Sequence, residues 1–277
     1  MRSPLLLAAC LSLAAAACGG SGVDCVSTPT SPCTGPDGTP TNVTVGFVTK
    51  TVVDQGVTYG FQVFIPAGYN DVAVAKVPVI LFMHGSAEKG SDNVKQTTVG
   101  LGPYVKARES TFPAIVVFPQ GPAAEGSQLV FDRIAKAALQ QVMAEYKKAD
   151  PARTYLTGLS YGGLRTFEMA SQNQTTFAAV VPISANLCGP CLTGVPTATF
   201  AQGVQFASNA LKTIPIWQFQ GALDTAIPVA DARAIRDAFM AVSTVYKYTE
   251  YPTGAHDIWD TVYNDPQMWT WLYAKSR

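Results

Sequence analysis

The stretch Tyr155–Ala170, YLTGLSYGGLRTFEMA, decides the fold of this 277-residue chain. Its first half is a short apolar run that predicts a buried β-strand, and its second half has the apolar spacing of a helix. Ser160 lies between them, flanked by Gly158 and Gly162. Because the chain holds 23 glycines, a Gly-x-Ser-x-Gly match is weak evidence by itself. The pattern on either side must decide whether Ser160 is functional.

Strands and helices alternate along the rest of the chain. Segments 44–53 and 57–66 predict an antiparallel hairpin, because apolar and polar residues alternate on both sides of Asp-Gln-Gly. We expect strands over 77–85, 113–121, 153–160, 177–184, 214–221 and 245–252, and helices over 131–146, 161–172, 229–242 and 265–275. This alternation predicts an α/β protein with a mainly parallel central sheet and helices on both faces. Residues 43–277 then form one domain, with a long insert at 185–213.

The setting of Ser160 fits a candidate nucleophile. A serine on a sharp turn from a buried strand into a helix is held exposed at the carboxyl edge of the sheet. Gly158 and Gly162 would prevent clashes in such a turn, and the helix N-terminus would favour a developing negative charge. A serine hydroxyl is a poor nucleophile at neutral pH, so a base is needed within hydrogen-bond reach.

The chain offers two histidines as that base, and His256 is the better placed because it follows the last strand. The acid that orients it is expected between the serine and the histidine in chain order. Asp224 lies just beyond a strand end, whereas Asp231 and Asp237 fall inside the next helix. Ser160, His256 and Asp224 are therefore the predicted catalytic residues, with the two helical aspartates as alternatives.

His84 ends a predicted strand, and we interpret it as a structural residue. The turn after it matters more, because the backbone N–H of Ser86, together with that of Tyr161, would form an oxyanion hole. The side chains of Tyr161 and Trp259 are candidate substrate contacts, and plain packing is the alternative for both.

Composition argues against several classes of partner. The formal net charge is zero and no basic run occurs, so we expect neither nucleic acid nor direct binding to an anionic membrane. The chemistry expected of Ser160 needs no cofactor, and no metal is expected.

The N-terminus predicts export. Residues 1–17 have a basic start, an apolar stretch and small residues before Cys18, as in a lipoprotein signal peptide whose Cys18 becomes lipidated. An earlier box ending at Cys10 and an ordinary secretory cleavage are the alternatives. Residues 18–42 are rich in Gly, Ser, Thr and Pro and predict a flexible linker. The protein would then be a cell-envelope lipoprotein or a secreted or periplasmic protein, touching a membrane only through its lipid.

Four cysteines remain besides Cys10 in the predicted signal and the lipidated Cys18. The local pairs, Cys25 with Cys33 and Cys188 with Cys191, are the predicted disulfides. The Cys-Gly-Pro-Cys stretch also matches a redox motif, but it lies in a Gly/Pro/Thr-rich loop rather than between a strand and a helix. A zinc site would need two further ligands, so a structural disulfide is favoured.

An ordered set of motifs resembles one known group. LFMHGSAEKGSDNVKQTTVGLGPYV, IVVFPQGP, YLTGLSYGG, VVPIS, IPIWQFQGALDTAIPV and YTEYPTGAHDIWD are similar to α/β-hydrolases of the esterase/"predicted peptidase" group, which is related to the phospholipase/carboxylesterase, feruloyl-esterase and polyhydroxybutyrate-depolymerase families. The resemblance implies Ser160, Asp224 and His256 as the triad, with Ser86 and Tyr161 as oxyanion donors. The chain departs from the group at Tyr161, where methionine is usual, and at Ala87, where glycine is usual.

The resemblance implies a serine esterase that cleaves a small-molecule or polymer-linked ester through an acyl-enzyme, and the N-terminal segment adds export. Two alternatives stay open: a serine peptidase of the prolyl-oligopeptidase type, and a non-catalytic surface protein that uses the fold for binding. Feruloyl, acetyl, polyester and short acyl esters are all compatible with the sequence.

Overall fold

The computed structural model describes residues 42–124, 128–187 and 199–277. Contacts group Val43–Arg277 into one compact unit, and the fold described below is that of this unit. The predicted signal peptide, the lipidation site at Cys18 and nearly all of the 18–42 linker lie outside the described residues. So do the four cysteines of the two predicted disulfides, Cys25, Cys33, Cys188 and Cys191.

The unit begins with the predicted antiparallel hairpin. β1 (Gly46–Asp54) pairs with β2 (Val57–Ile65) along their whole lengths. The two-residue turn between them, Gln55 and Gly56, has positive φ at both positions (50° and 83°), which suits the twist of an antiparallel pair. The structure thus confirms the hairpin predicted from the alternating sequence.

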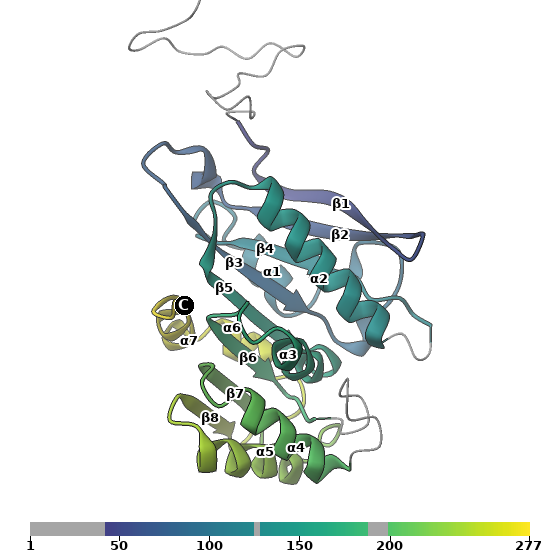
Figure 1. The fold of residues 1–277 in the computed structure, drawn as a ribbon, viewed down its shortest axis with the longest axis vertical. Helices are drawn as coiled ribbons and strands as arrows, with labels where there is room; N and C mark the ends of the chain where they lie inside the picture. The colour runs from purple at the N-terminus through teal and green to yellow at the C-terminus, as the bar shows by residue number, and fades with distance from the viewer. Residues whose placement is uncertain (1–41, 125–127, 188–198) are drawn as a thin grey trace, which may run out of the picture. The chain divides into compact units, whose positions relative to one another are not determined.

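The remaining strands extend this hairpin into one eight-stranded sheet (Figure 1). They are β3 (Val77–Met83), β4 (Ile115–Pro119), β5 (Ala149–Leu159), β6 (Ala179–Ile183), β7 (Ile216–Gly221) and β8 (Tyr246–Tyr251). The strand order is β1-β2-β4-β3-β5-β6-β7-β8. β2 pairs antiparallel with β4, and every pair from β4 to β8 is parallel. A mainly parallel sheet is therefore confirmed.

Helices cover both faces of this sheet, as predicted (Figure 1). One face carries α2 (Gln128–Glu145), α3 (Tyr161–Gln172), α4 (Phe200–Ala210) and α5 (Val229–Val242). The other carries α1 (Leu101–Lys106), α6 (Trp259–Tyr263) and α7 (Pro266–Tyr273). Short 3-10 turns are η1 (Ala67–Asn70), η2 (Ser86–Glu88) and η3 (Lys95–Thr97).

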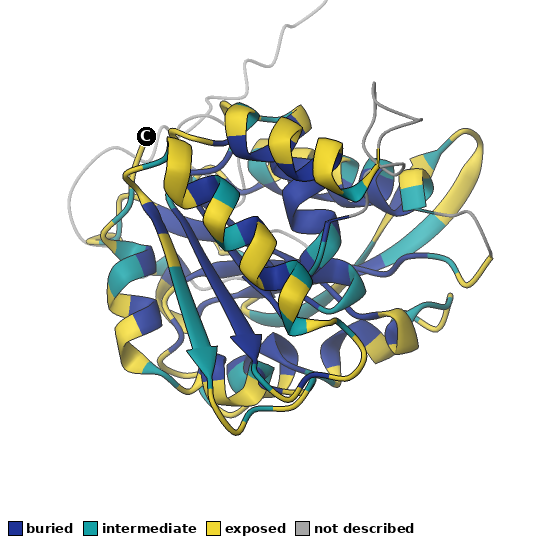
Figure 2. Ribbon diagram, turned by 90° about the horizontal axis from the view of Figure 1, so that it is seen from below, coloured by how far each residue is buried: buried dark blue, intermediate teal, exposed yellow. Residues whose placement is uncertain are grey.

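Alternating side chains of each strand feed two hydrophobic cores. In β3, Leu81 points to the core under α2 and α3, while Phe82 points to the core under α1, α6 and α7. Because both faces are covered, the inner strands are buried throughout, and the exposed residues lie on the outer sides of the helices (Figure 2). This explains why the inner strands have continuous apolar sequences.

The insert at 185–213 is partly helical. Thr199 and Gln202 form a capping box at the start of α4, which packs against α5 and α3. The end of the insert therefore belongs to the helical layer. The predicted helix from Phe131 begins earlier, at Gln128.

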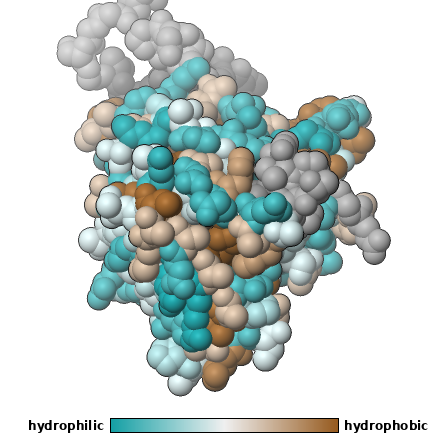
Figure 3. Space-filling model, turned by 60° about the horizontal axis from the view of Figure 1, so that its bottom comes forward, coloured by the Kyte–Doolittle hydropathy of each residue, from teal (hydrophilic) through white to brown (hydrophobic). Residues whose placement is uncertain are grey.

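The described surface is mixed in polarity. On the face in Figure 3, hydrophilic and hydrophobic side chains are interspersed. Within the described residues, no helix combines the length and the apolar character needed to cross a bilayer.

Candidate active site

Ser160 occupies the sharp turn between β5 and α3. Its backbone is in the left-handed half of conformational space, with φ 53° and ψ −120°, an uncommon state for a residue other than glycine. A Cβ on Gly162 would overlap the Met83 carbonyl oxygen, and one on Gly158 would lie 2.6 Å from the Gly162 carbonyl oxygen. The two glycines are therefore needed for the close approach of the turn to β3, as the sequence predicted.

The structure brings the three predicted catalytic residues together. His256 Nε2 lies 2.8 Å from Ser160 Oγ, and His256 Nδ1 lies 2.8 Å from Asp224 Oδ2. The three residues follow the carboxyl ends of β5, β7 and β8, which meet at one edge of the parallel sheet. This arrangement can move a proton from the serine hydroxyl to an imidazole that a carboxylate orients.

The Asp224 carboxylate is buried and held by four hydrogen bonds. Its Oδ1 accepts from the backbone N–H groups of Ala226 and Ile227, both at 2.8 Å. Its Oδ2 accepts from Gln220 Nε2, also at 2.8 Å, in addition to His256. These donors occupy both oxygens of the carboxylate and fix its plane relative to the imidazole.

The two alternative aspartates are not in this arrangement. Asp231 and Asp237 both lie in α5, and Asp237 is exposed and paired with Arg236. The structure therefore places Asp224, and neither of the helical residues, against the imidazole.

The loop that carries His256 is fastened to the loop that carries Asp224. Leu223 N donates to the Gly254 carbonyl at 2.8 Å, and a Cβ on Gly221 would overlap the Ala255 carbonyl oxygen. The ring of Trp259, a predicted substrate contact, meets the His256 ring edge-on at 5.6 Å. Trp259 is also partly buried against the core, so it supports the imidazole from the side.

His84 is buried and holds strand ends together. Its Nδ1 lies 2.6 Å from the Gly85 carbonyl oxygen, and its Nε2 accepts from Gly121 N at 2.8 Å. These partners require the proton on Nδ1. Burial lowers the pKa of His84 to about 4, so the ring is neutral at neutral pH. The structural interpretation of His84 agrees with these contacts.

The turn after His84 lies against the nucleophile. A Cβ on Gly85 would be 3.8 Å from Ser160 Cβ and 2.8 Å from Glu88 Oε2. Ser86 is the first residue of η2, and Tyr161 is the first residue of α3. Both amides thus lie at helix starts beside Ser160, where backbone N–H groups have no partner within the helix. Their role as oxyanion donors stays a prediction.

The side chain of Tyr161 packs beside the site. Its ring is nearly parallel to that of Phe131, with centroids 6.1 Å apart, and Lys89 Nζ lies 3.9 Å from its centroid. Its hydroxyl is buried without a hydrogen-bond partner among the described residues, and burial raises its pKa. The Tyr161 ring therefore packs against Phe131 and Lys89, as the packing alternative expects. Contact of Tyr161 with substrate stays a prediction.

Sequence reasoning missed several neighbours of the site. Gln220 donates to the Asp224 carboxylate, and Lys89 lies over the Tyr161 ring. Ser184 donates from its hydroxyl to the His256 carbonyl. All three residues lie within the ordered motifs, but nothing in those motifs marks them as neighbours of the site, because their contacts depend on segments that only the fold brings together.

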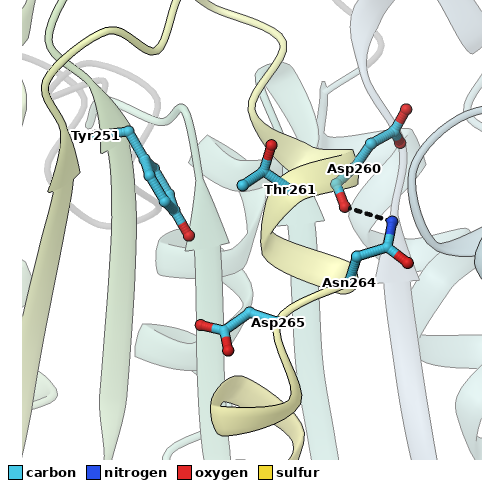
Figure 4. A pocket seen from close by; sticks show the side chains of 5 residues that line it. All are labelled: Tyr251, Asp260, Thr261, Asn264 and Asp265. Carbon is cyan, nitrogen blue, oxygen red and sulfur yellow. Dashed lines mark hydrogen bonds between the residues drawn. The ribbon is translucent and has the colours of Figure 1, made fainter.

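A surface pocket of about 580 Å³ lies beside α6 (Figure 4). Its lining consists of Tyr251, Asp260, Thr261, Asn264 and Asp265. Asn264 Nδ2 donates to the Asp260 carbonyl, and Asp265 caps α7. None of the three residues of the Ser–His–Asp arrangement lines this pocket.

Comparison with known proteins finds a family match and solved structures of similar fold. A family described as "Putative esterase" matches residues 55–270. A solved thermostable esterase is 26% identical, with a TM-score of 0.64, over 83% of this chain and 63% of its own. The chain thus spans less than two thirds of that esterase. No curated protein matches the sequence.

Two further structures share the fold. A ferulic acid esterase is 15% identical, with a TM-score of 0.61, over 82% of this chain and 97% of its own. The S-formylglutathione hydrolase of Staphylococcus aureus is 16% identical, with a TM-score of 0.60, over 82% of this chain and 96% of its own. The predicted α/β-hydrolase fold is confirmed.

Proposed function

Since this chain belongs to the esterase family, we propose that it hydrolyses carboxylic esters with Ser160 as the nucleophile. The family match also confirms the resemblance seen in the ordered motifs. The observation that carries the proposal is the pair of 2.8 Å contacts that link Ser160 Oγ through His256 to Asp224 Oδ2.

Acylation begins with proton transfer. His256 Nε2 takes the proton of Ser160 Oγ as the oxygen attacks the ester carbonyl, and the imidazolium then gives that proton to the leaving alcohol. Asp224 holds the histidine with its proton on Nδ1, so Nε2 is free to accept. Water activated by the same nitrogen attacks the acyl-enzyme and releases the acid, which restores the serine hydroxyl.

The negative charge that develops on the carbonyl oxygen needs donors. We assign this role to the backbone N–H groups of Ser86 and Tyr161, which begin η2 and α3 beside Ser160. Loss of one such donor costs about 10²–10³-fold in kcat in known hydrolases. The partial positive charge at the start of α3 adds to this stabilisation.

Export and lipidation complete the proposal. The apolar N-terminal segment and the small residues before Cys18 support a signal peptide with a lipid anchor. Labelled palmitate that is incorporated into the wild type and not into Cys18→Ser would establish the anchor. A wild type without label, or label that survives Cys18→Ser, would contradict it.

Two assays test the catalytic proposal. A fluorophosphonate probe should label the wild-type protein and leave Ser160→Ala unlabelled, because phosphonylation needs the nucleophile. Labelling that survives Ser160→Ala would refute the assignment, and absent labelling of the wild type would favour the non-catalytic binding alternative. Turnover of p-nitrophenyl esters beside aminoacyl anilides separates esterase from peptidase, and preference for the anilide would overturn the esterase proposal.

A further inference from the structure

The end of β6 contacts two members of the triad through consecutive residues. The Ile183 carbonyl accepts from Ser160 N at 2.9 Å. Ser184 Oγ donates to the His256 carbonyl at 2.6 Å. One short piece of backbone therefore connects the turn of the nucleophile to the loop of the base.

Ser184 is held in an unusual conformation. Its side chain is fully buried, its φ is 47°, and its N–H donates to the Phe219 carbonyl at 2.9 Å. A left-handed backbone at a residue other than glycine costs about 1–3 kcal/mol and persists where surrounding contacts fix it. Its hydroxyl has a single proton to donate, and that proton goes to His256.

The backbone of His256 has few other anchors. It lies in the loop between β8 and α6, and its side chain is 26% exposed. In the part of the chain that the structure describes, no backbone–backbone hydrogen bond outside the helices and strands involves His256. The Ser184 hydroxyl is thus a direct tie between this backbone and the sheet.

We propose that Ser184 is a positioning residue for the reaction: its hydroxyl holds the His256 backbone so that Nε2 stays within hydrogen-bond distance of Ser160 Oγ. The inference rests on the proposed function, because it assigns His256 as the base. It follows that loss of the hydroxyl should slow the step in which the serine attacks, and should leave substrate binding unchanged.

Two substitutions separate this role from a merely structural one. Ser184→Ala removes only Oγ and keeps the strained backbone, whereas Ser184→Gly removes Oγ and also relieves the strain. If the hydroxyl positions His256, both variants lose about tenfold in the maximal rate of fluorophosphonate labelling and in kcat for p-nitrophenyl butyrate. The half-saturating concentrations stay unchanged. Thermal unfolding should show Ser184→Gly to be the more stable of the two.

Ser171→Ala is the matched control. Ser171 is also buried, and its hydroxyl donates to the Phe167 carbonyl at 2.8 Å within α3. This variant loses a similar hydrogen bond without touching the histidine loop, so its labelling rate should equal that of the wild type.

Three results would overturn the inference: unchanged rates in both Ser184 variants, recovery of the wild-type rate in Ser184→Gly alone, or an equal loss in Ser171→Ala. Ser160→Ala distinguishes failure of the proposed function from failure of the positioning role of Ser184. If Ser160→Ala retains ester turnover, the proposed function fails. If Ser160→Ala is inactive and the Ser184 variants react normally, only the positioning role fails.

Discussion

Replacing Asp224 with asparagine tests the orienting acid without changing its shape. Both carboxylate oxygens now accept two hydrogen bonds each. An asparagine can keep its oxygen on the N–H groups of Ala226 and Ile227, which leaves its NH₂ group facing Gln220 Nε2 and His256 Nδ1. His256 must then accept on Nδ1 and carry its proton on Nε2, so it cannot take the proton of Ser160.

The expected loss is large in rate and modest in stability. The wrong histidine tautomer costs about 10⁴-fold in kcat in hydrolases with a Ser-His-Asp triad. The NH₂ group introduced at position 224 faces Gln220 Nε2, which thereby loses its acceptor in a buried site. This contact of two donors lowers the free energy of unfolding by about 1–3 kcal/mol. A folded protein with almost no turnover is therefore the predicted result.

The assay combines kcat/KM for p-nitrophenyl butyrate with urea unfolding followed by circular dichroism. Asp237→Asn is the control, because Asp237 is an exposed residue of α5 paired with Arg236, and its kcat should not change. If Asp224→Asn keeps more than about a tenth of the wild-type kcat/KM, Asp224 does not set the tautomer, and the account of proton transfer is wrong.

Three further predictions follow from single residues. Gly162→Ala should abolish stable folding, seen as loss of soluble protein, because its Cβ overlaps a β3 carbonyl, whereas Gly68→Ala, with open space around it, should fold normally. His84 should stay neutral down to about pH 4 in an NMR titration of His256→Ala, which leaves His84 as the one histidine. Because burial lowers the pKa of His84 in the folded state, its contribution to stability is full above about pH 6.5 and is lost as the pH falls towards 4. A titration of His84 near pH 6.5 would contradict its burial. Tyr161→Phe should raise the free energy of unfolding by up to about 1 kcal/mol in urea, because the hydroxyl it removes is buried without a partner; a clear loss of stability would reveal a hydrogen bond at that hydroxyl.

The sequence predicted the elements whose physical signal is local. The hairpin follows from alternation around Gln55 and Gly56, and the turn at Ser160 follows from the glycines that its geometry requires. Position past a strand end also favoured Asp224 over Asp231, and in the structure Asp224 lies against His256 while Asp231 lies in α5.

What the sequence could not predict depends on contacts between distant segments. The sheet order places β4 between β2 and β3, which no local pattern reveals. The hydrogen bond from Ser184 to His256 joins residues 72 positions apart. The glutamine beside Asp224 shows the same limit, because a buried amide and a surface amide look identical in a sequence.

The place of β8 in the sheet orders the assembly of the site in time. Ser160 and Asp224 follow β5 and β7, while His256 follows β8, which is both the last of the described strands and an edge of the sheet. During synthesis from the N-terminus, Ser160 and Asp224 are made before His256. Under the proposed mechanism, a nascent chain therefore carries an inert serine until β8 docks, so the docking of this edge strand switches on the reactivity of Ser160.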